Sequence, residues 1–221
     1  MIHYYIQKRE LPPSEIYEDM KTSAVFEILS LLPPEKMWNI FREASELPTD
    51  IQSPTSLKDV MFWPHLEGIE GTNHSRFVEP DVIFQFDNVD VIIEAKRNDS
   101  NPQDPKQWNS ELEAYKKESY PGKKKKVYLI AVDGNGGKNG KSAENEEVYQ
   151  TSWRRLCSAV YNQNNKGRII DLLLKAFEVL GINSYSPLSE FISEFKFKLD
   201  RYSFSDAKNN LNNIIGWRTT K

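Results

Sequence analysis

The sequence predicts an α/β fold built on a mixed β-sheet, and two observations carry this prediction. Residues 79–98, EPDVIFQFDNVDVIIEAKRN, form two apolar runs around a short polar turn, which is the pattern of a β-hairpin. A helical stretch at 106–119 and the β-prone run VYLIAV at 127–132 come next. A hairpin supplies antiparallel pairs and a strand–helix–strand unit supplies a parallel crossover, so together they predict a mixed sheet.

Helical segments flank this core on both sides. One extends from about Ser14 to Leu32 and ends at Pro33-Pro34, where a second one, Glu35–Leu47, begins. The short apolar run Val60–Trp63 is expected to open the sheet, and further helices are predicted at 152–161, 168–180 and 188–199. With no internal repeat, we expect a single domain over 1–221, with a helical N-terminal part at 14–47, a core at about 57–135 and extra C-terminal helices at 150–200.

Composition limits the class of protein. A chain of 221 residues with 38% apolar content can bury a real core, and a net charge of -3 means that any nucleic-acid surface must be a local patch. The N-terminal residues lack the apolar segment of a signal peptide, and no apolar run approaches the length of a membrane span. Cys157 is the only cysteine, which excludes an internal disulfide. We therefore expect a cytoplasmic protein with no membrane partner.

Three charged residues lie in the predicted hairpin: Asp81, Glu94 and Lys96. Glu94 and Lys96 share one face of their strand because successive side chains alternate. A two-residue turn sets Asp81 opposite Glu94, a four-residue turn sets it opposite Lys96, and an odd turn pairs it with Ala95 unless a bulge intervenes. Either even register brings the three charges together.

These charges have two explanations. One is an exposed ion pair between Asp81 and Lys96 at the rim of the sheet, which contributes little to stability. The other starts from the continuous apolar run at 91–93, which is typical of a strand buried on both faces. Charges beside such a strand are costly unless they bind something, and carboxylates on rigid strands attract a hard divalent cation.

Pro80-Asp81, twelve residues and then Glu94-Ala95-Lys96 resemble the signature of the PD-(D/E)xK nuclease superfamily. The resemblance implies a restriction-endonuclease-like core of about four strands flanked by helices. It also implies Mg²⁺, with Mn²⁺ as a substitute, held by Asp81, Glu94 and the Ala95 carbonyl, and Lys96 as the catalytic lysine.

Many members of this superfamily add a glutamate from the helix before the sheet. At 100° per residue, Glu27 falls about 20° from Met20, inside an apolar stripe with Ile16, Ala24 and Leu31. Glu27 is therefore the candidate further ligand and catalytic residue. The alternative is that it reaches the edge of the stripe or pairs with a buried base.

Four residues are candidates for substrate binding: Arg97, Gln107, Lys138 and Lys141. Several branches of the superfamily carry Gln-x-x-x-Tyr on the helix after the lysine. Here Glu111 takes the fourth place after Gln107, so the branch is not assigned. Lys138 and Lys141 lie in a glycine-rich loop that resembles a Walker loop, but Asn135 stands where that motif needs glycine.

The expected function is a metal-dependent nuclease, and the resemblance alone favours DNA over RNA. A homodimer is possible, because cutting both strands commonly needs two active sites. The alternative is a lapsed nuclease-fold module for nucleic-acid binding or assembly, which uses a C-terminal apolar stripe: Leu188, Phe191, Ile192, Phe195 and Leu199.

Overall fold

A mixed six-stranded sheet forms the centre of the computed structural model, which describes residues 18–67, 77–98, 100–119, 125–163 and 167–182. Its strands are β1 (Leu57–Phe62), β4 (Val82–Phe86), β5 (Val89–Ala95), β6 (Lys126–Val132), β7 (Gly140–Lys141) and β8 (Val148–Thr151), in the spatial order β1-β4-β5-β6-β8-β7. The pairs β1–β4, β4–β5 and β7–β8 are antiparallel, whereas β5–β6 and β6–β8 are parallel. The predicted mixed α/β fold is confirmed.

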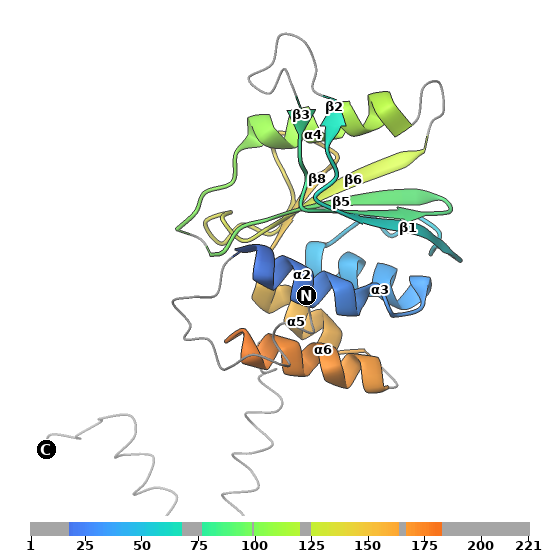
Figure 1. The fold of residues 1–221 in the computed structure, drawn as a ribbon, viewed down its shortest axis with the longest axis vertical. Helices are drawn as coiled ribbons and strands as arrows, with labels where there is room; N and C mark the ends of the chain where they lie inside the picture. The colour runs from blue at the N-terminus through green and yellow to red at the C-terminus, as the bar shows by residue number, and fades with distance from the viewer. Residues whose placement is uncertain (1–17, 68–76, 99, 120–124, 164–166, 183–221) are drawn as a thin grey trace, which may run out of the picture. The chain divides into compact units, whose positions relative to one another are not determined.

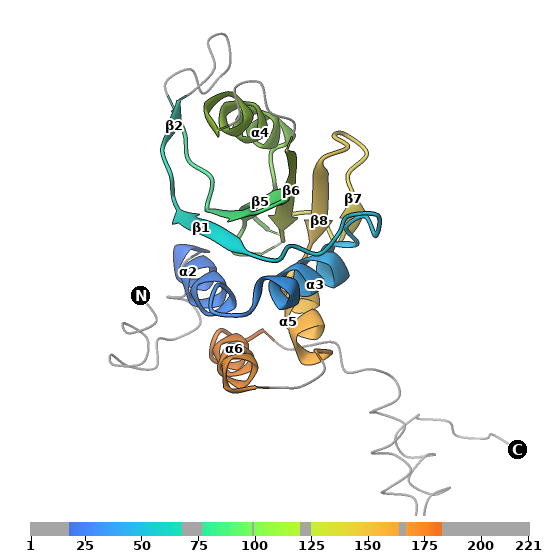
Figure 2. The same ribbon diagram turned by 90° about the vertical axis from the view of Figure 1, so that its right-hand side faces the viewer.

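Helices cover both faces of the sheet (Figure 1). One face carries α4 (Pro105–Ser119), and the other carries α2 (Glu18–Leu29), α3 (Pro34–Ser45) and α5 (Trp153–Tyr161). The helix α6 (Arg168–Val179) packs on α2 and α5, on their side away from the sheet. A small sheet of β2 (Leu66–Glu67) and β3 (Phe77–Val78) lies beside α4 (Figure 2). The helix α4 connects the parallel strands β5 and β6 and lies across one face of the sheet.

Two apolar clusters hold these layers together. The larger one lies between the sheet and the four-helix face, where Phe84 packs 6.1 Å from Phe26 and 5.2 Å from Phe41, measured between ring centroids. The smaller one fills the space beneath α4 and includes Trp108 and Leu112. Every residue of β5 is buried, which confirms that this strand is covered on both faces.

The sheet is wider than the four strands expected. β8 was not predicted, because its four residues follow a long polar loop and give too short a pattern. The loop after β6 continues into β7 rather than into a helix. A Walker loop needs a helix N-terminus to bind phosphate, so this alternative is not supported.

The predicted helices at 35–47, 106–119, 152–161 and 168–180 are confirmed as α3, α4, α5 and α6. The helix expected at 14–32 is α2, which is described from Glu18 to Leu29. Residues 14–17 and the helix predicted at 188–199 lie outside the described residues. The described residues all belong to one structural unit, Met1–Ser184, and none of their helices is long and apolar enough to cross a membrane.

Candidate functional site

The hairpin register brings the two predicted carboxylates, Asp81 and Glu94, together at one edge of the sheet. β4 and β5 pair Val82 with Ile93, and two residues connect the strands. Continuing this pairing by one residue sets Asp81 opposite Glu94. The first of the two even registers is therefore confirmed.

Asp81 is fixed across the hairpin by a hydrogen bond. Its Oδ2 atom accepts from the backbone N–H of Ala95 at 2.7 Å, and the residue is only 8% exposed. The backbone of Asp81 is held as well, since its carbonyl accepts from the N–H of Trp63 at 3.0 Å. The carboxylate is therefore held in place at the end of a buried strand.

Lys96 pairs with Glu94, and its Nζ atom donates to Glu94 Oε1. The Lys96 backbone is fixed by two contacts: its N–H donates to the Val132 carbonyl at 2.8 Å, and its carbonyl accepts from Trp153 Nε1 at 2.9 Å. The alternative explanation, an exposed ion pair between Asp81 and Lys96 at the rim of the sheet, is therefore wrong. Asp81 and Glu94 are both buried, and the lysine bonds to Glu94.

Burial perturbs the ionisation of all three groups. It raises the pKa of Asp81 to about 8, and repulsion from Glu94 adds to the shift. It also raises the pKa of Glu94, although Lys96 acts in the opposite direction. Burial alone would lower the pKa of Lys96, but the attraction of Glu94, Glu18 and Asp81 outweighs it and raises that pKa. Carboxylates that are costly to ionise where they stand favour a bound cation.

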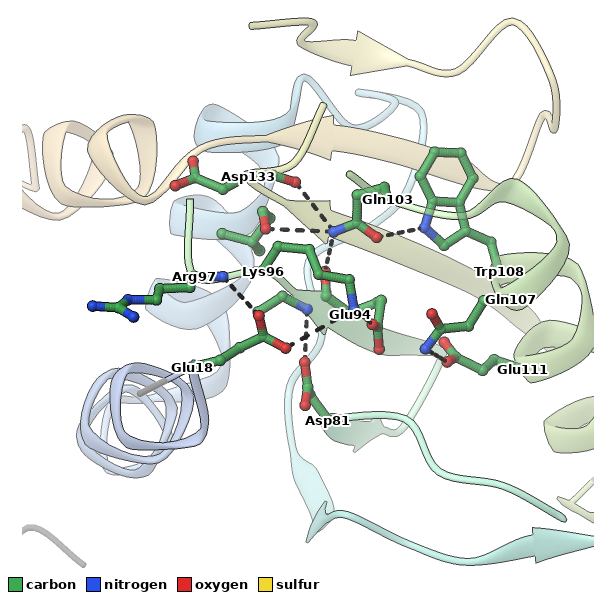
Figure 3. A network of polar contacts seen from close by, with 12 residues as sticks. Glu18, Asp81, Glu94, Lys96, Arg97, Gln103, Gln107, Trp108, Glu111 and Asp133 are labelled. Atoms are coloured by element: carbon green, nitrogen blue, oxygen red, sulfur yellow. Dashed lines mark hydrogen bonds and ion pairs between the residues drawn. The ribbon is translucent and has the colours of Figure 1, made fainter. Parts of the chain in front are cut away.

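Glu18 is the carboxylate that α2 contributes to this cluster, and it was not predicted (Figure 3). Its Oε2 atom accepts from the Arg97 N–H at 2.7 Å, and its Oε1 atom lies 3.9 Å from Lys96 Nζ. Lys21, one turn further on, donates to the Arg97 carbonyl at 2.8 Å. The first turn of α2 therefore holds both the backbone N–H and the backbone carbonyl of Arg97, the residue that follows Lys96.

Glu27 is not brought to the cluster. It lies nine residues beyond Glu18, which on an α-helix is an advance of about 14 Å and a rotation of about half a turn. The apolar stripe that singled it out is wrong, because Leu31, two residues beyond the end of α2, is 59% exposed, whereas seven residues of α2 are buried. The sheet and α6 cover α2 from two sides, so its burial does not follow one stripe.

The helix α4 supplies two further polar side chains, Gln107 and Glu111 (Figure 3). Gln107 Nε2 donates to Glu111 Oε1 at 2.8 Å, and the nearby Gln107 side chain acts to lower the pKa of Glu94 against the effect of burial. Glu111 is 1% exposed, and burial raises its pKa well above the ordinary value, with repulsion from Glu94 adding to the shift. The site therefore holds a third buried carboxylate.

Gln103 is a second residue that the sequence did not single out. Its Nε2 atom donates to the Glu94 carbonyl at 3.1 Å and to the Asp133 carbonyl at 3.2 Å, while its Oε1 atom accepts from Trp108 Nε1 at 2.8 Å. This amide ties the loop before α4 to the ends of β5 and β6. Its partners are mostly backbone carbonyls, which leave no signature in a sequence.

The basic side chains predicted to bind substrate lie outside the carboxylate cluster. The Arg97 guanidinium points away from Glu94 (Figure 3). Lys138 and Lys141 are exposed, and Lys141 lies in β7, three strands and about 14 Å from β5. Neither lysine belongs to the carboxylate cluster, and contact with an extended polyanion stays a prediction for all three basic residues.

Within the described part of the chain, no group of three or more His, Cys, Asp or Glu residues is arranged to hold a metal ion. The donor set nevertheless suits a hard divalent cation, because Asp81, Glu94 and Glu111 are buried oxygen donors. One oxygen of Glu94 faces Lys96, and one of Glu111 faces Gln107. Coordination by all three carboxylates would require their side chains to turn, and coordination by the Ala95 carbonyl stays a prediction.

Comparisons with known proteins leave the family open. No family model matches the chain, and no solved structure matches it. The chain is 33% identical over 87 residues to an uncharacterized protein, PM0110, of Pasteurella multocida (strain Pm70). The similarity covers 39% of this chain and 31% of that protein, so the chain spans about a third of the length of this relative. A functional assignment therefore depends on the chemistry of the site.

Proposed function

We propose that this chain is a divalent-metal-dependent nuclease that hydrolyses phosphodiester bonds. The observation that supports it most strongly is the placement of Asp81 and Glu94, which are buried and opposite each other on adjacent strands, with Lys96 bonded to Glu94. Strands fix such groups more rigidly than loops do. DNA as substrate, a homodimer and a cytoplasmic location are parts of the same proposal that rest on the sequence.

Each residue of the site has a role in this proposal. Asp81 and Glu94 would hold Mg²⁺ or Mn²⁺, together with the Ala95 carbonyl. When bound, the ion would activate a water and stabilise charge on the phosphate. The Lys96 ammonium would donate to a phosphate oxygen or orient the attacking water. Glu18 would position Lys96 by holding the next peptide.

Cleavage of plasmid DNA tests this function. The intact protein is expected to nick or linearise supercoiled plasmid with Mg²⁺ or Mn²⁺ and to be inactive in EDTA. Asp81→Ala is expected to abolish cleavage, whereas Glu113→Ala, which removes an exposed carboxylate of α4, should cleave like the wild type. A labelled RNA assayed in parallel decides between the two nucleic acids.

Two results would contradict the proposed function. One is that the intact protein cleaves plasmid to the same extent in EDTA as with Mg²⁺ or Mn²⁺. The other is that Asp81→Ala leaves cleavage unchanged. Binding of nucleic acid without cleavage would favour the alternative, a lapsed nuclease-fold module. The apolar stripe at 188–199 that this alternative uses lies outside the described residues.

The two glutamates of α2 are expected to differ in their effect on activity. Glu18→Gln should lower the cleavage rate about 10- to 100-fold, the range typical of residues that orient a metal site, because it weakens the hold on Arg97. Glu27→Gln should cleave at nearly the wild-type rate, since this side chain is not part of the cluster. Single-turnover cleavage rates measure both effects. A larger loss of cleavage rate in Glu27→Gln than in Glu18→Gln would show that α2 contributes Glu27, and not Glu18, to the site.

A further inference from the structure

Glu111 is a buried carboxylate with one unpartnered oxygen. It is 1% exposed, and its Oε2 atom has no hydrogen-bond partner among the residues that the structure describes. Its Oε1 atom accepts from Gln107 at 2.8 Å. A buried polar atom without a partner costs free energy, and a carboxylate oxygen in that state is a strong candidate for binding a cation.

The surroundings of Glu111 are predominantly negative. Its strongest charge interaction is repulsion from Glu94, followed by repulsion from Asp81. Lys96 is also close, but its ammonium bonds to Glu94. Together with Glu18, four carboxylates lie around Lys96 at this edge of the sheet, and the second nearby lysine, Lys21, interacts with Glu18. A divalent ion would compensate charge that Lys96 alone leaves unbalanced.

Glu18 is less suited than Glu111 to act as the third ligand. One of its oxygens accepts from the Arg97 N–H at 2.7 Å, and the other lies 3.9 Å from Lys96 Nζ. Binding a cation would draw Glu18 away from the peptide that it holds. Glu111, in contrast, is oriented by Gln107 through one oxygen and keeps the other for a ligand, as outer hydrogen bonds orient many metal-binding carboxylates.

We infer that Glu111 is a ligand of the divalent cation, so that the third carboxylate of the site comes from α4 and not from α2. This inference rests on the proposed function, because it shares its cation with Asp81 and Glu94. The side chain extends from α4 toward the end of β5, beside Gln107 (Figure 3). The site is then formed by Asp81 immediately before β4, Glu94 of β5 and Glu111 of α4, with Glu18 as a positioning residue.

Direct binding of Mn²⁺ to the full chain, without nucleic acid, tests this inference. Titration followed by electron paramagnetic resonance of free Mn²⁺ gives the dissociation constant for each variant. Glu111→Gln is expected to raise it about 10- to 100-fold or more. The matched control Glu113→Gln, an exposed carboxylate of the same helix, is expected to bind like the wild type, whereas Glu18→Gln is expected to weaken binding less than Glu111→Gln does.

A shorter carboxylate provides the second variant. Glu111→Asp keeps the donor type, so it is expected to bind Mn²⁺ more tightly than Glu111→Gln and more weakly than the wild type. Thermal unfolding in EDTA shows whether each variant is folded. If Glu111→Gln does not fold, the order of Glu111→Asp and the wild type decides the question, and equal affinity of these two would overturn the inference.

The outcomes separate the inference from the proposed function. Wild-type affinity in Glu111→Gln, with binding lost in Asp81→Asn, would overturn the role of Glu111 and leave the metal site in place. Wild-type affinity in Asp81→Asn, or no binding by the intact chain, would overturn both. Weakened binding in Glu18→Gln but not in Glu111→Gln would assign the third carboxylate to α2 instead.

Discussion

Lys96→Met is expected to slow metal-dependent cleavage about 100- to 1000-fold, the loss typical of removing one donor to the charge that develops in a transition state. Methionine retains much of the apolar stem, so the packing of the side chain changes little. The ammonium is lost, and with it the hydrogen bond to Glu94 and the donor to the phosphate. Because the proposed cation ligands remain, Mn²⁺ binding should persist.

Single-turnover cleavage of plasmid at saturating metal measures this loss. Lys126→Met serves as the control, since Lys126 is an exposed lysine at the far end of β6 and should cleave like the wild type. Cleavage by Lys96→Met at the wild-type rate would remove Lys96 from the chemistry. Loss of both cleavage and Mn²⁺ binding would instead show that Lys96 acts by shaping the metal site.

Asp81→Asn is expected to stabilise the metal-free protein near pH 9 and to change it little near pH 4. Burial and repulsion from Glu94 raise the pKa of Asp81 from 3.8 to about 8 in the folded state. The folded protein therefore binds this proton more tightly than the unfolded chain does. The contribution of Asp81 to stability is fully present below about pH 4 and is lost as the pH rises through about 8.

The size of this effect follows from the pKa shift. At about 1.4 kcal/mol per pKa unit, a shift of this size makes the loss for wild-type Asp81 several kcal/mol at the alkaline end. Asparagine is neutral at every pH, and its amide oxygen still accepts from the Ala95 N–H, so the variant avoids this loss. Denaturant unfolding in EDTA across this pH range measures the difference.

Asp87→Asn, at the turn of the same hairpin, is a control in which the effect on stability is expected to depend on pH in the opposite direction. A hydrogen bond from the Thr55 side chain lowers the pKa of Asp87, so its contribution is present above the ordinary carboxylate pKa and is lost as the pH falls. This substitution should therefore destabilise the protein at neutral pH. A destabilised Asp81→Asn near pH 9 would contradict the electrostatic account of the site.

The part of the site that lies on the hairpin could be predicted because strand geometry is simple. Side chains alternate along a strand, so the turn length alone decides whether Asp81 faces Glu94. The apolar run in β5 also indicated correctly that both faces of this strand are buried. These rules act between neighbouring residues, which a sequence displays directly.

The helix contribution could not be predicted by the same reasoning. A stripe argument assumes that one side of a helix faces water, but α2 packs against both the sheet and α6. Glu18 lies in the first turn of α2, and its partner is a peptide N–H that is 79 residues away in the sequence. Such a contact depends on the tertiary arrangement and has no local pattern.

The third buried carboxylate, Glu111, could be predicted from the sequence only in part. Gln107 and Glu111 share a helix face by their spacing of one turn, but the burial of Glu111 depends on how α4 lies over β5. β8 and the Gln103 contacts were missed for a related reason. A four-residue strand is recognised by the strand that it pairs with, and the Gln103 amide by the backbone carbonyls that it bonds to. The sequence does not show which residues these partners are.

A crystal of the full chain soaked in Mn²⁺, with anomalous diffraction recorded, tests the central claim most directly. The account predicts one strong anomalous peak between Asp81 and Glu94, with carboxylate oxygens of both within about 2.0 to 2.6 Å of the ion. Oxygens of Glu111 are expected in the same shell. An ion bound elsewhere, or none at this edge of the sheet while Lys96 keeps its bond to Glu94, would contradict a metal-dependent nuclease site.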